Sequence, residues 1–560
     1  MPVHTSSNLA ESAIVRAAIT AKVENAAGAA KSGGKCGRVG RLLPCRSCSS
    51  RSFFFFKKVE AQTAISSDGE SLQDHNGYLV DAHFASRNIQ TTPDGNTILI
   101  PQPSKDPNDP LNWTWGKKHL FLFIIAATSL LPDYGSATGA VTLLPQAEIW
   151  HMDPDVVNHS QVGNVFMIGA GGIVAICLGA YFGRLPVMFW FMILALGTAL
   201  WCTAAETFES FMAARILNGF FSPVAEAGGL MFIKDMFFFH EHARKINIWA
   251  SFIILSPYFG PLFSAFIIDT QKWQWAFGLY TTITGICVAA IFALLDETYY
   301  DRKLPPSEQP QRRSRVLRVI GVEQWHTRHL RNTFTEAMSR PFIVLVKLPV
   351  LISNIYYLLA FAWVVGINTT LAIFLTPLYN FGPKQIGFFY FTPIVAAILG
   401  EIAGHWLHDL VAKWYQRRNN GRLEPEARLA VVGISTPFLC SGLILLGFSL
   451  ERAYHYMLAA LGWGLYVFGI MITTVGVNAY NLDAYPTASG EVAGWLNLSR
   501  VAGGFIISYF QVRWAEEMGA IKSFGIQAAI CFGAFFLIVL LQFDGKQLRE
   551  WSGQPHFKTI

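Results

Sequence analysis

The stretch "SQVGNVFMIGAGGIVAICLGAYF", residues 160–182, contains no Asp, Glu, Lys or Arg. The hydrocarbon core of a bilayer is about 30 Å thick, and about 20 consecutive apolar residues in a helix are needed to cross it. The stretch meets both requirements of length and apolar character. It therefore predicts a transmembrane helix.

Similar apolar segments occur in series along the chain. They lie near 119–144, 186–206, 208–233, 246–268, 276–296, 343–376, 385–408, 429–449, 456–480, 490–511 and 523–543. The segment 343–376 is long enough to require a kink or a tilt, and Gly366 offers a place for a kink. Six segments, a polar break and six more indicate two homologous halves. The predicted fold is an all-α membrane protein with twelve transmembrane helices in two six-helix halves.

The composition supports a membrane protein. The 560 residues are 52% hydrophobic and 14% charged, whereas soluble proteins have about 25% charged residues. The net charge of +6 does not indicate a nucleic-acid partner, because Lys and Arg lie in short clusters between apolar runs. Cys36, Cys45 and Cys48 lie in a polar leader, where "CRSC" lacks the second ligand pair of a zinc site. We therefore predict no metal and no cofactor.

Five regions follow from the positions of these segments. They are a leader at 1–117, a six-helix bundle at 118–296, a central loop at 297–342, a second six-helix bundle at 343–543 and a tail at 544–560. The leader has low hydropathy and a Pro/Asp/Asn-rich end, so we expect it to be largely disordered. No signal-peptide pattern opens the chain, which predicts a cytoplasmic N-terminus.

The charges of the predicted loops agree with this orientation. With the N-terminus inside, the inner loops carry 18 Lys and Arg and the outer loops carry 5, as the positive-inside rule requires. Both termini and the central loop are therefore predicted to be cytoplasmic. The sequon at Asn158 falls in the first outer loop, where glycosylation is predicted. The sequons at Asn368 and Asn497 fall inside spans and should be silent.

Three short motifs occur at fixed places among the spans. They are "YFGRLPV" at 181–187, "RILNG" at 215–219 and "SPYFGPLFSA" at 256–265. The first resembles the second half of the signature G-x-x-x-D-x-x-G-R-R of the major facilitator superfamily, with Gly183 and Arg184 matching. The second resembles the R-x-x-x-G motif of that superfamily. The third is similar to the G-P-x-x-G motif of its proton-driven drug antiporters, with Gly260 and Pro261 matching.

The first signature is incomplete in this chain. Its first glycine, its Asp and its second basic residue fall on Ile176, Ala180 and Leu185. Other pieces resemble fungal members of the superfamily over roughly residues 100–550. These are "DPNDPLNW", "DMFFFHEHAR", "DETYY" and "NLDAYPTASGE".

The motifs also have a physical interpretation. A Gly-Arg turn at a helix end allows Arg184 to bind helix C-terminal carbonyls or an acid and so to latch two helices together. Gly260 and Pro261 permit a close helix approach and a bend in the fifth span. An ordinary kinked packing helix is an equally good interpretation of that pair.

Charged side chains within the spans are functional candidates, since an unpaired charge at membrane depth is costly. Asp133 lies near the midplane of the first span, with a structural partnership as the alternative. The resemblance implies that spans one and four face a central cavity, so that Asp133 and Arg215 pair across it, and it assigns proton coupling to Arg215. Glu226 is either a coupling residue or an anchor for the adjacent loop. Arg500 has no obvious partner and suggests a structural salt bridge.

The segment "GEIAGHWLHD", residues 400–409, combines a glutamate, two histidines and an aspartate. Helical spacing places His405 one turn after Glu401. The pair is interpreted either as a proton relay or as a structural hydrogen bond, and a metalloenzyme site is disfavoured because the pattern is not H-E-x-x-H. Asp409 is predicted to be a latch acid of the second half, with Arg417 or Arg418 as its partner.

The resemblance implies a secondary transporter that moves a small molecule by alternating access with proton coupling.

 The bilayer and protons are its expected partners, and no enzyme activity is predicted. An acid near the midplane favours a polar or cationic substrate. Aromatic side chains of the seventh span are expected to line the site: Tyr356, Tyr357, Phe361 and Trp363. We expect a monomer in the plasma membrane of a fungal cell. A transporter-like receptor that binds a nutrient and signals without turnover is the alternative.

Overall fold

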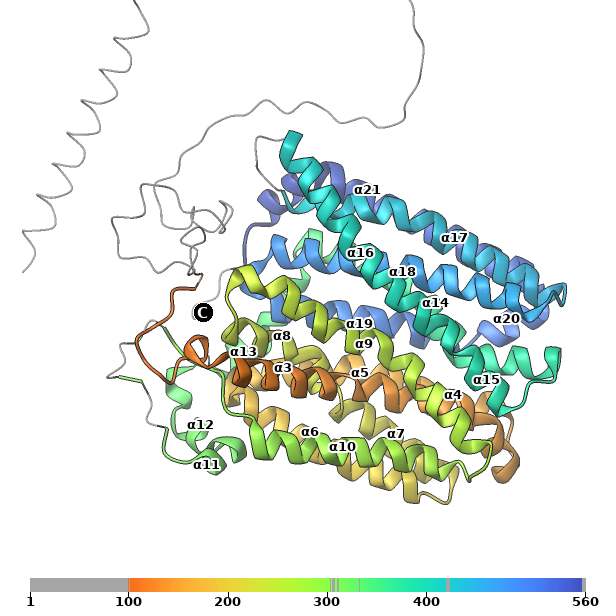
Figure 1. The fold of residues 1–560 in the computed structure, drawn as a ribbon, viewed down its shortest axis with the longest axis horizontal. Coiled ribbons are helices and arrows are strands. Elements are labelled where there is room, and N and C mark those ends of the chain that lie inside the picture. The colour runs from red at the N-terminus through yellow and green to blue at the C-terminus, as the bar shows by residue number, and fades with distance from the viewer. Residues whose placement is uncertain are drawn as a thin grey trace, which may run out of the picture. The chain divides into compact units, whose positions relative to one another are not determined.

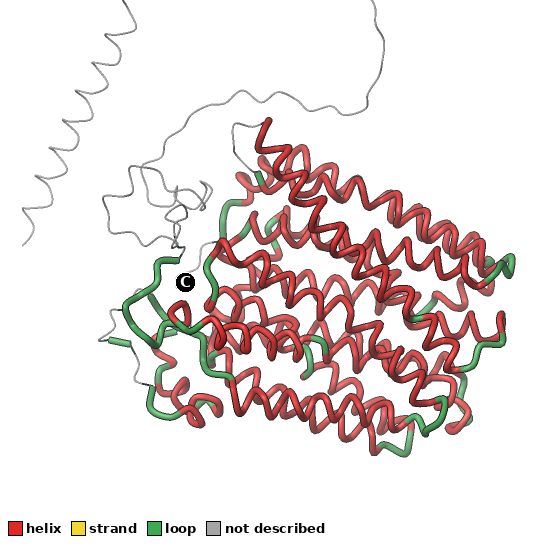
Figure 2. Tube along the Cα trace, in the orientation of Figure 1, coloured by secondary structure: helices red, strands yellow, loops and turns green. Residues whose placement is uncertain are grey.

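The computed structural model describes residue 99 and residues 101–555, apart from 303, 305–307, 310–311, 332 and 419–423. Most of the predicted leader, including Cys36, Cys45 and Cys48, lies outside the described residues. The described part of the chain is almost entirely helical, and its loops lie mainly at the ends of the helices (Figure 2).

The helices of the first half follow the predicted spans closely. They are α3 (Trp115–Ser129), α4 (Leu131–Trp150), α5 (Pro154–Phe182), α6 (Arg184–Ala204), α7 (Phe208–Phe221), α8 (Val224–Met236), α9 (Phe239–Ile268) and α10 (Gln274–Leu294). The pairs α3–α4 and α7–α8 each occupy one predicted span. The first half therefore has six membrane-crossing units, with the first and fourth interrupted.

The second half has the same plan. Its helices are α14 (Leu348–Tyr379), α15 (Pro383–Phe389), α16 (Phe391–Arg418), α17 (Ala430–Glu451), α18 (Tyr456–Ala484), α19 (Ser489–Ser508), α20 (Gln511–Met518) and α21 (Ala520–Ser552). Short 3-10 helices, η4 (Pro425–Leu429) and η5 (Pro486–Ala488), precede α17 and α19. Figure 1 shows α3–α10, coloured orange to green, gathered beside α14–α21, coloured cyan to blue.

Eleven helical segments in the described residues are long and apolar enough to cross a membrane. The segment α19 is the twelfth unit of the predicted fold and is not among these eleven. It carries Glu491, Asn497 and Arg500, which lower its mean hydropathy. The helix α19 is therefore less apolar than the other units because it carries buried charged side chains.

The central region contains structure that a loop prediction does not include. Its helices are α11 (Arg315–Ile320), α12 (Val322–His326) and α13 (Phe334–Leu345), with the 3-10 helix η3 (Arg328–Leu330). The predicted seventh span begins at 343. In the structure α13 continues to Leu345, and the membrane-crossing helix α14 starts at Leu348. α14 continues as one helix through Gly366, where an added Cβ would overlap the Gln511 side chain. Gly366 therefore makes room for a neighbouring side chain.

The structure places the predicted glycosylation site in a helix and not in an outer loop. Asn158 lies in the first turns of α5 and its side chain is 1% exposed. The turn between α4 and α5 is shorter than the predicted outer loop, because α4 extends to Trp150 and α5 begins at Pro154. The Asn158 side chain is therefore covered in the folded protein, so glycosylation there stays a prediction.

Candidate functional site

A guanidinium of the second half binds two carboxylates of the first half. Arg500 Nη1 lies 2.6 Å from Asp133 Oδ2, and Arg500 Nη2 donates to Glu226 Oε1. All three side chains are buried. One guanidinium against two ionised carboxylates leaves this cluster with a net charge of about −1 when both acids are ionised. We call Asp133, Glu226 and Arg500 the central cluster.

Both acids of the central cluster stand at helix starts within a span. Asp133 lies in the first turn of α4, which begins after the interruption at Leu130, and Glu226 lies in the first turn of α8, which follows Pro223. The N-terminus of a helix carries a partial positive charge and free N–H groups. The helix interruptions therefore provide a favourable field for negative charge inside the bundle, as discontinuous helices do in other transporters.

The polar and aromatic neighbours of Arg500 fix its position. Asn497 Oδ1 accepts hydrogen bonds from Arg500 Nε at 3.2 Å and from Nη2 at 2.9 Å. The Arg500 guanidinium carbon also lies 5.5 Å from the centre of the Phe361 ring. Each of these contacts favours the charged guanidinium. Arg500 is therefore held between two acids, an amide and a ring.

A small cavity adjoins the central cluster. Its lining includes Asp133, Ser136, Gln161, Phe361, Asn368 and Arg500. The free volume is about 30 Å³, enough for about two water molecules and too small for an organic compound. Buried oxygens of Ser136, Gln161 and Asn368 have no hydrogen-bond partner within the described part of the chain. The cavity is thus small, and part of its lining consists of buried oxygens that can still accept a ligand's hydrogen bonds.

The two halves are in contact both at the cavity and away from it. Lys234 of α8 donates to the carbonyl of Pro486, and Arg340 Nε of α13 donates to Glu491 Oε1 at 2.7 Å. Asn368 Nδ2 of α14 donates to the Pro257 carbonyl at 3.0 Å, and both of these residues line the cavity. The central cluster is therefore one of several polar contacts that join the halves.

The predicted pair between Asp133 and Arg215 is wrong. Arg215 Nη2 donates to the carbonyl oxygen of Ser136 at 2.6 Å, and its guanidinium carbon lies 5.6 Å and 5.5 Å from the rings of Phe211 and Phe277. Among the described residues, none of the ion pairs includes Arg215. Arg215 instead joins α7 to α4 one helical turn after Asp133. The cation that pairs with Asp133 is Arg500, which belongs to the second half.

Of the four predicted cavity aromatics, only Phe361 lines the cavity. Tyr357 donates to or accepts from Thr474 Oγ1 at 3.1 Å. Tyr356 and Trp363 are buried and are not among the residues that line the cavity. Helical spacing alone does not distinguish the side of α14 that faces the central cluster, because α14 is buried on most of its circumference.

The predicted close approach at Gly260 is present. An added Cβ at Gly260 would overlap the carbonyl oxygen of Tyr134 and lie 3.1 Å from the Thr138 nitrogen. Pro257 and Pro261 both lie within α9. Gly260 thus lets α9 contact the backbone of α4 next to Asp133.

The Gly-Arg turn forms a latch in the first half. Arg184 pairs with Asp235, and its Nη1 donates to the carbonyl of Met231 at 2.9 Å. Gly183 has φ of 102°, which a residue with a side chain rarely adopts. Arg184 at the start of α6 is therefore tied to the end of α8, as a helix-to-helix latch requires.

The second half repeats this latch with different residues. Arg428, at the start of the ninth span, pairs with Asp483 near the end of α18, and its Nη1 lies 2.6 Å from His408 Nε2. Arg184–Asp235 and Arg428–Asp483 thus each join the third membrane-crossing unit of one half to the fourth. This is the pattern of an internal repeat.

The predicted latch role of Asp409 is wrong. The Asp409 side chain is 55% exposed, and its ion-pair partner is His405 at 4.0 Å. None of the ion pairs found among the described residues joins Asp409 to Arg417 or Arg418. The acid of the second latch is Asp483, which belongs to the tenth span.

The predicted relay between Glu401 and His405 has no direct hydrogen bond. His405 Nδ1 lies 3.2 Å from the Asn247 amide of α9, which joins the two halves. Glu401 Oε2 is buried and has no hydrogen-bond partner within the described residues. Within the part of the chain that the structure describes, no group of three His, Cys, Asp or Glu side chains is placed to hold a metal ion.

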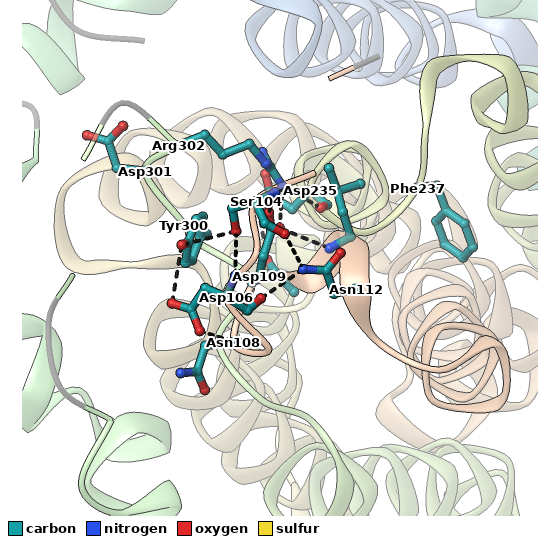
Figure 3. Close-up of polar contacts among 12 residues, drawn as sticks. Ser104, Asp106, Asn108, Asp109, Asn112, Asp235, Phe237, Tyr300, Asp301 and Arg302 are labelled. Carbon is teal, nitrogen blue, oxygen red and sulfur yellow. Dashed lines mark hydrogen bonds and ion pairs between the residues drawn. The ribbon is translucent and has the colours of Figure 1, made fainter. Parts of the chain in front are cut away.

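The end of the leader docks on the first-half latch. We call residues 104–112 the strap, and Figure 3 shows its contacts. Asp109 Oδ1 accepts from Arg302 Nη2 at 2.9 Å, and the same Nη2 donates to the Asp235 carbonyl at 3.2 Å. Ser104 Oγ donates to the Tyr300 hydroxyl at 3.3 Å. The strap therefore reaches the latch acid through Arg302.

We expect Asp109→Asn to lower the free energy of unfolding by about 1–3 kcal/mol, because a buried acceptor loses its charge-assisted bond. Burial alone raises the pKa of Asp109, but Arg302 and the N–H groups of Ser104 and Leu111 hold that pKa below its ordinary value. The ionised form therefore adds stability above the unfolded-state pKa, and this contribution is lost as the pH falls through the folded-state pKa. Thermal unfolding of the purified protein between neutral and acidic pH measures the difference.

Asp106→Asn is the matched control for this prediction. Asp106 is also in the strap and accepts from Tyr300 at 3.2 Å, but it has no arginine partner among the described residues. Asp106→Asn should therefore lower the unfolding midpoint less than Asp109→Asn does. Equal midpoints for Asp109→Asn and the wild type at neutral pH would contradict the strap's role.

The fold and the central cluster define a helical membrane protein with a buried charged cluster between two halves. Residues 122–508 match the Major Facilitator Superfamily. Since this match covers more than half of the chain, the protein belongs to that superfamily.

Similar proteins agree with this assignment. An uncharacterized transporter of Schizosaccharomyces pombe is 24% identical over 469 residues, covering 82% of this chain and 94% of that protein. The efflux pump radE of Floropilus chiversii is 22% identical over 469 residues, covering 81% and 84%. The xylose transporter XylE of E. coli has the same fold, with a TM-score of 0.56 at 14% identity, covering 76% of this chain and 98% of XylE. The chain is thus a multi-pass membrane transporter of fungal type with a small-molecule substrate.

Proposed function

We propose that the protein is a proton-coupled transporter that moves a polar or cationic compound by alternating access. The observation that carries this proposal is the central cluster, in which one guanidinium serves two buried carboxylates that belong to the other half. A buried excess of one negative charge is costly in a membrane protein. It becomes favourable when a proton or a substrate cation joins the cluster.

The cluster can couple that binding event to the movement of the halves. Arg500 contacts both Asp133 and Glu226 only while α19 lies against α4 and α8. A proton taken from water by either carboxylate removes one of these attractions, and the two halves then separate more readily. A substrate cation that binds the same carboxylate displaces the proton to water. Competition of this kind gives exchange of protons for substrate.

A motif and a relative support the proposed direction of transport. Gly260 and Pro261 resemble the drug-antiporter motif, and one relative is named as an efflux pump, so we propose export of an organic compound. The excess of basic residues in the loops on one side supports cytoplasmic termini. We further propose a monomer in the plasma membrane.

The test is transport into proteoliposomes with an imposed pH gradient, using organic cations selected by a growth screen. Asp133→Asn keeps the shape of the side chain and removes its titration. We expect proton-driven transport to fall more than about tenfold, which corresponds to about 1.4 kcal/mol in a rate-limiting step. The remaining transport should depend less on pH.

Asp155→Asn provides the control, because Asp155 makes an ion pair with Arg513, which is 74% exposed, outside the cavity. That variant should transport like the wild type. A wild-type rate and pH profile in Asp133→Asn would remove Asp133 from the coupling step. Binding of the compound without accumulation in the vesicles would favour the receptor alternative.

A further inference from the structure

The short helices α11 and α12 expose a group of large apolar side chains. Their exposed fractions are between 39% and 49% for Val316, Leu317, Ile320, Val322 and Trp325. Exposure of this much apolar surface to water is unfavourable. Single exposed apolar residues are common on proteins. Five within ten residues of sequence indicate a surface that contacts an apolar partner.

The position of these helices brings them to the membrane boundary. The Trp190 indole of α6 donates to the Ile320 carbonyl at 3.0 Å, and Gly321 packs against Pro186 near the start of α6. Val319 is fully buried in the core of the first half. The turn between α11 and α12 is thus fixed beside the first two turns of a membrane-crossing helix. Trp190 is itself 47% exposed, as expected for an aromatic residue at the bilayer interface.

Arginines of this region divide into two groups. Arg315 and Arg318 face the end of α10, where Arg315 Nε donates to the Leu295 carbonyl at 3.1 Å and Arg318 Nε donates to Asp296 at 2.7 Å. Arg313 and Arg328 are exposed. Among the described residues, neither has an ion pair, and the Arg328 guanidinium lies 4.3 Å from the Trp325 ring centre. The outward charge beside the apolar side chains is therefore positive.

We propose that the surface formed by α11 and α12 lies in the headgroup layer of the adjacent leaflet and binds acidic phospholipids. The apolar side chains enter the outer part of the acyl layer, and Arg313 and Arg328 bind the headgroup phosphates. An amphipathic helix with apolar and basic residues has this mode of binding. Basic residues near an acidic leaflet are attracted to its headgroups, so the partner is an acidic lipid and not a neutral one.

The test measures the depth of the surface in vesicles. An environment-sensitive fluorescent amino acid is introduced at Val322 of the full chain, and at Glu308 as the control, because Glu308 is an exposed residue of the same connecting region. Both variants are reconstituted into vesicles of phosphatidylcholine with phosphatidylglycerol, and the acyl chains carry bromine near the headgroups. We expect quenching and a blue shift at Val322 and neither at Glu308. Equal, water-like emission at the two positions would overturn the proposal and leave the surface open to a soluble partner.

A second arm tests the choice of lipid. Emission at Val322 should shift further when phosphatidylglycerol is added to phosphatidylcholine, and Arg313→Glu with Arg328→Glu should abolish that further shift. The same response to phosphatidylglycerol in the double variant would overturn the assignment of acidic lipids. Because the readout is depth, the result is independent of the transported compound and of proton coupling.

Discussion

Arg500→Gln should destabilise the protein by about 3–5 kcal/mol, the usual effect of removing one partner of a buried ion pair. The substitution removes the only cation that contacts the carboxylates of Asp133 and Glu226 among the described ion pairs. Two buried acids then face each other without a counter-charge, and one must take up a proton for the fold to persist. The thermal unfolding midpoint of the purified protein should fall strongly at neutral pH and less in acid.

Rescue separates the structural and the coupling roles of the central cluster. Combining Arg500→Gln with Asp133→Asn and Glu226→Gln removes the unbalanced charge and should restore much of the lost stability. Proton-driven transport should remain absent, because the cluster no longer titrates. Arg513→Gln is the control, since the Arg513 side chain is 74% exposed and surface pairs contribute about 0–1 kcal/mol. A wild-type unfolding midpoint in Arg500→Gln would contradict the expected dependence of the fold on the two ion pairs of Arg500.

The membrane-crossing units could be predicted from the sequence because their signal is local. A run of about 20 apolar residues defines each unit by itself. Gly183 and Gly260 are found through their resemblance to family motifs, and the structure shows that neither position has room for a side chain. The repeat of the latch was harder to locate. The prediction placed its acid at Asp409, whereas Asp483 follows two spans later. An arginine at the start of the third unit and an acid at the end of the fourth is the pattern that would have found it.

The partners in the central cluster could not be predicted in the same way. Asp133 and Arg500 are 367 positions apart in the sequence, and the contact depends on how the two halves meet. One local signal in the sequence marks both acids. Proline precedes each acid at its helix start, in Pro132–Asp133 and in Pro223 before Glu226. A proline just before a buried acid in the middle of a span indicates an interrupted helix with its positive end directed at the carboxylate.

Gly260→Ala should destabilise the protein by about 1–3 kcal/mol, the range for overpacking a close contact. The new methyl group would overlap the Tyr134 carbonyl, which belongs to the backbone of α4 and cannot rotate away. Relief requires α9 and α4 to separate. Because Tyr134 follows Asp133 in the chain, that separation also moves Asp133 relative to Arg500. We therefore expect a lower unfolding midpoint together with an altered pH dependence of transport.

Gly197→Ala makes the same substitution without the contact. An added Cβ at Gly197 of α6 would have nothing within 4 Å, so the variant should be neutral or more stable by up to about 1 kcal/mol, since alanine favours helix over glycine. The difference between the two variants isolates the helix approach from helix propensity. Equal unfolding midpoints for the two would show that α4 and α9 have room to spare at Gly260. A lower midpoint with an unchanged pH profile would show that the approach supports the fold without positioning Asp133, because displacement of that carboxylate must alter the proton uptake on which the proposed coupling depends.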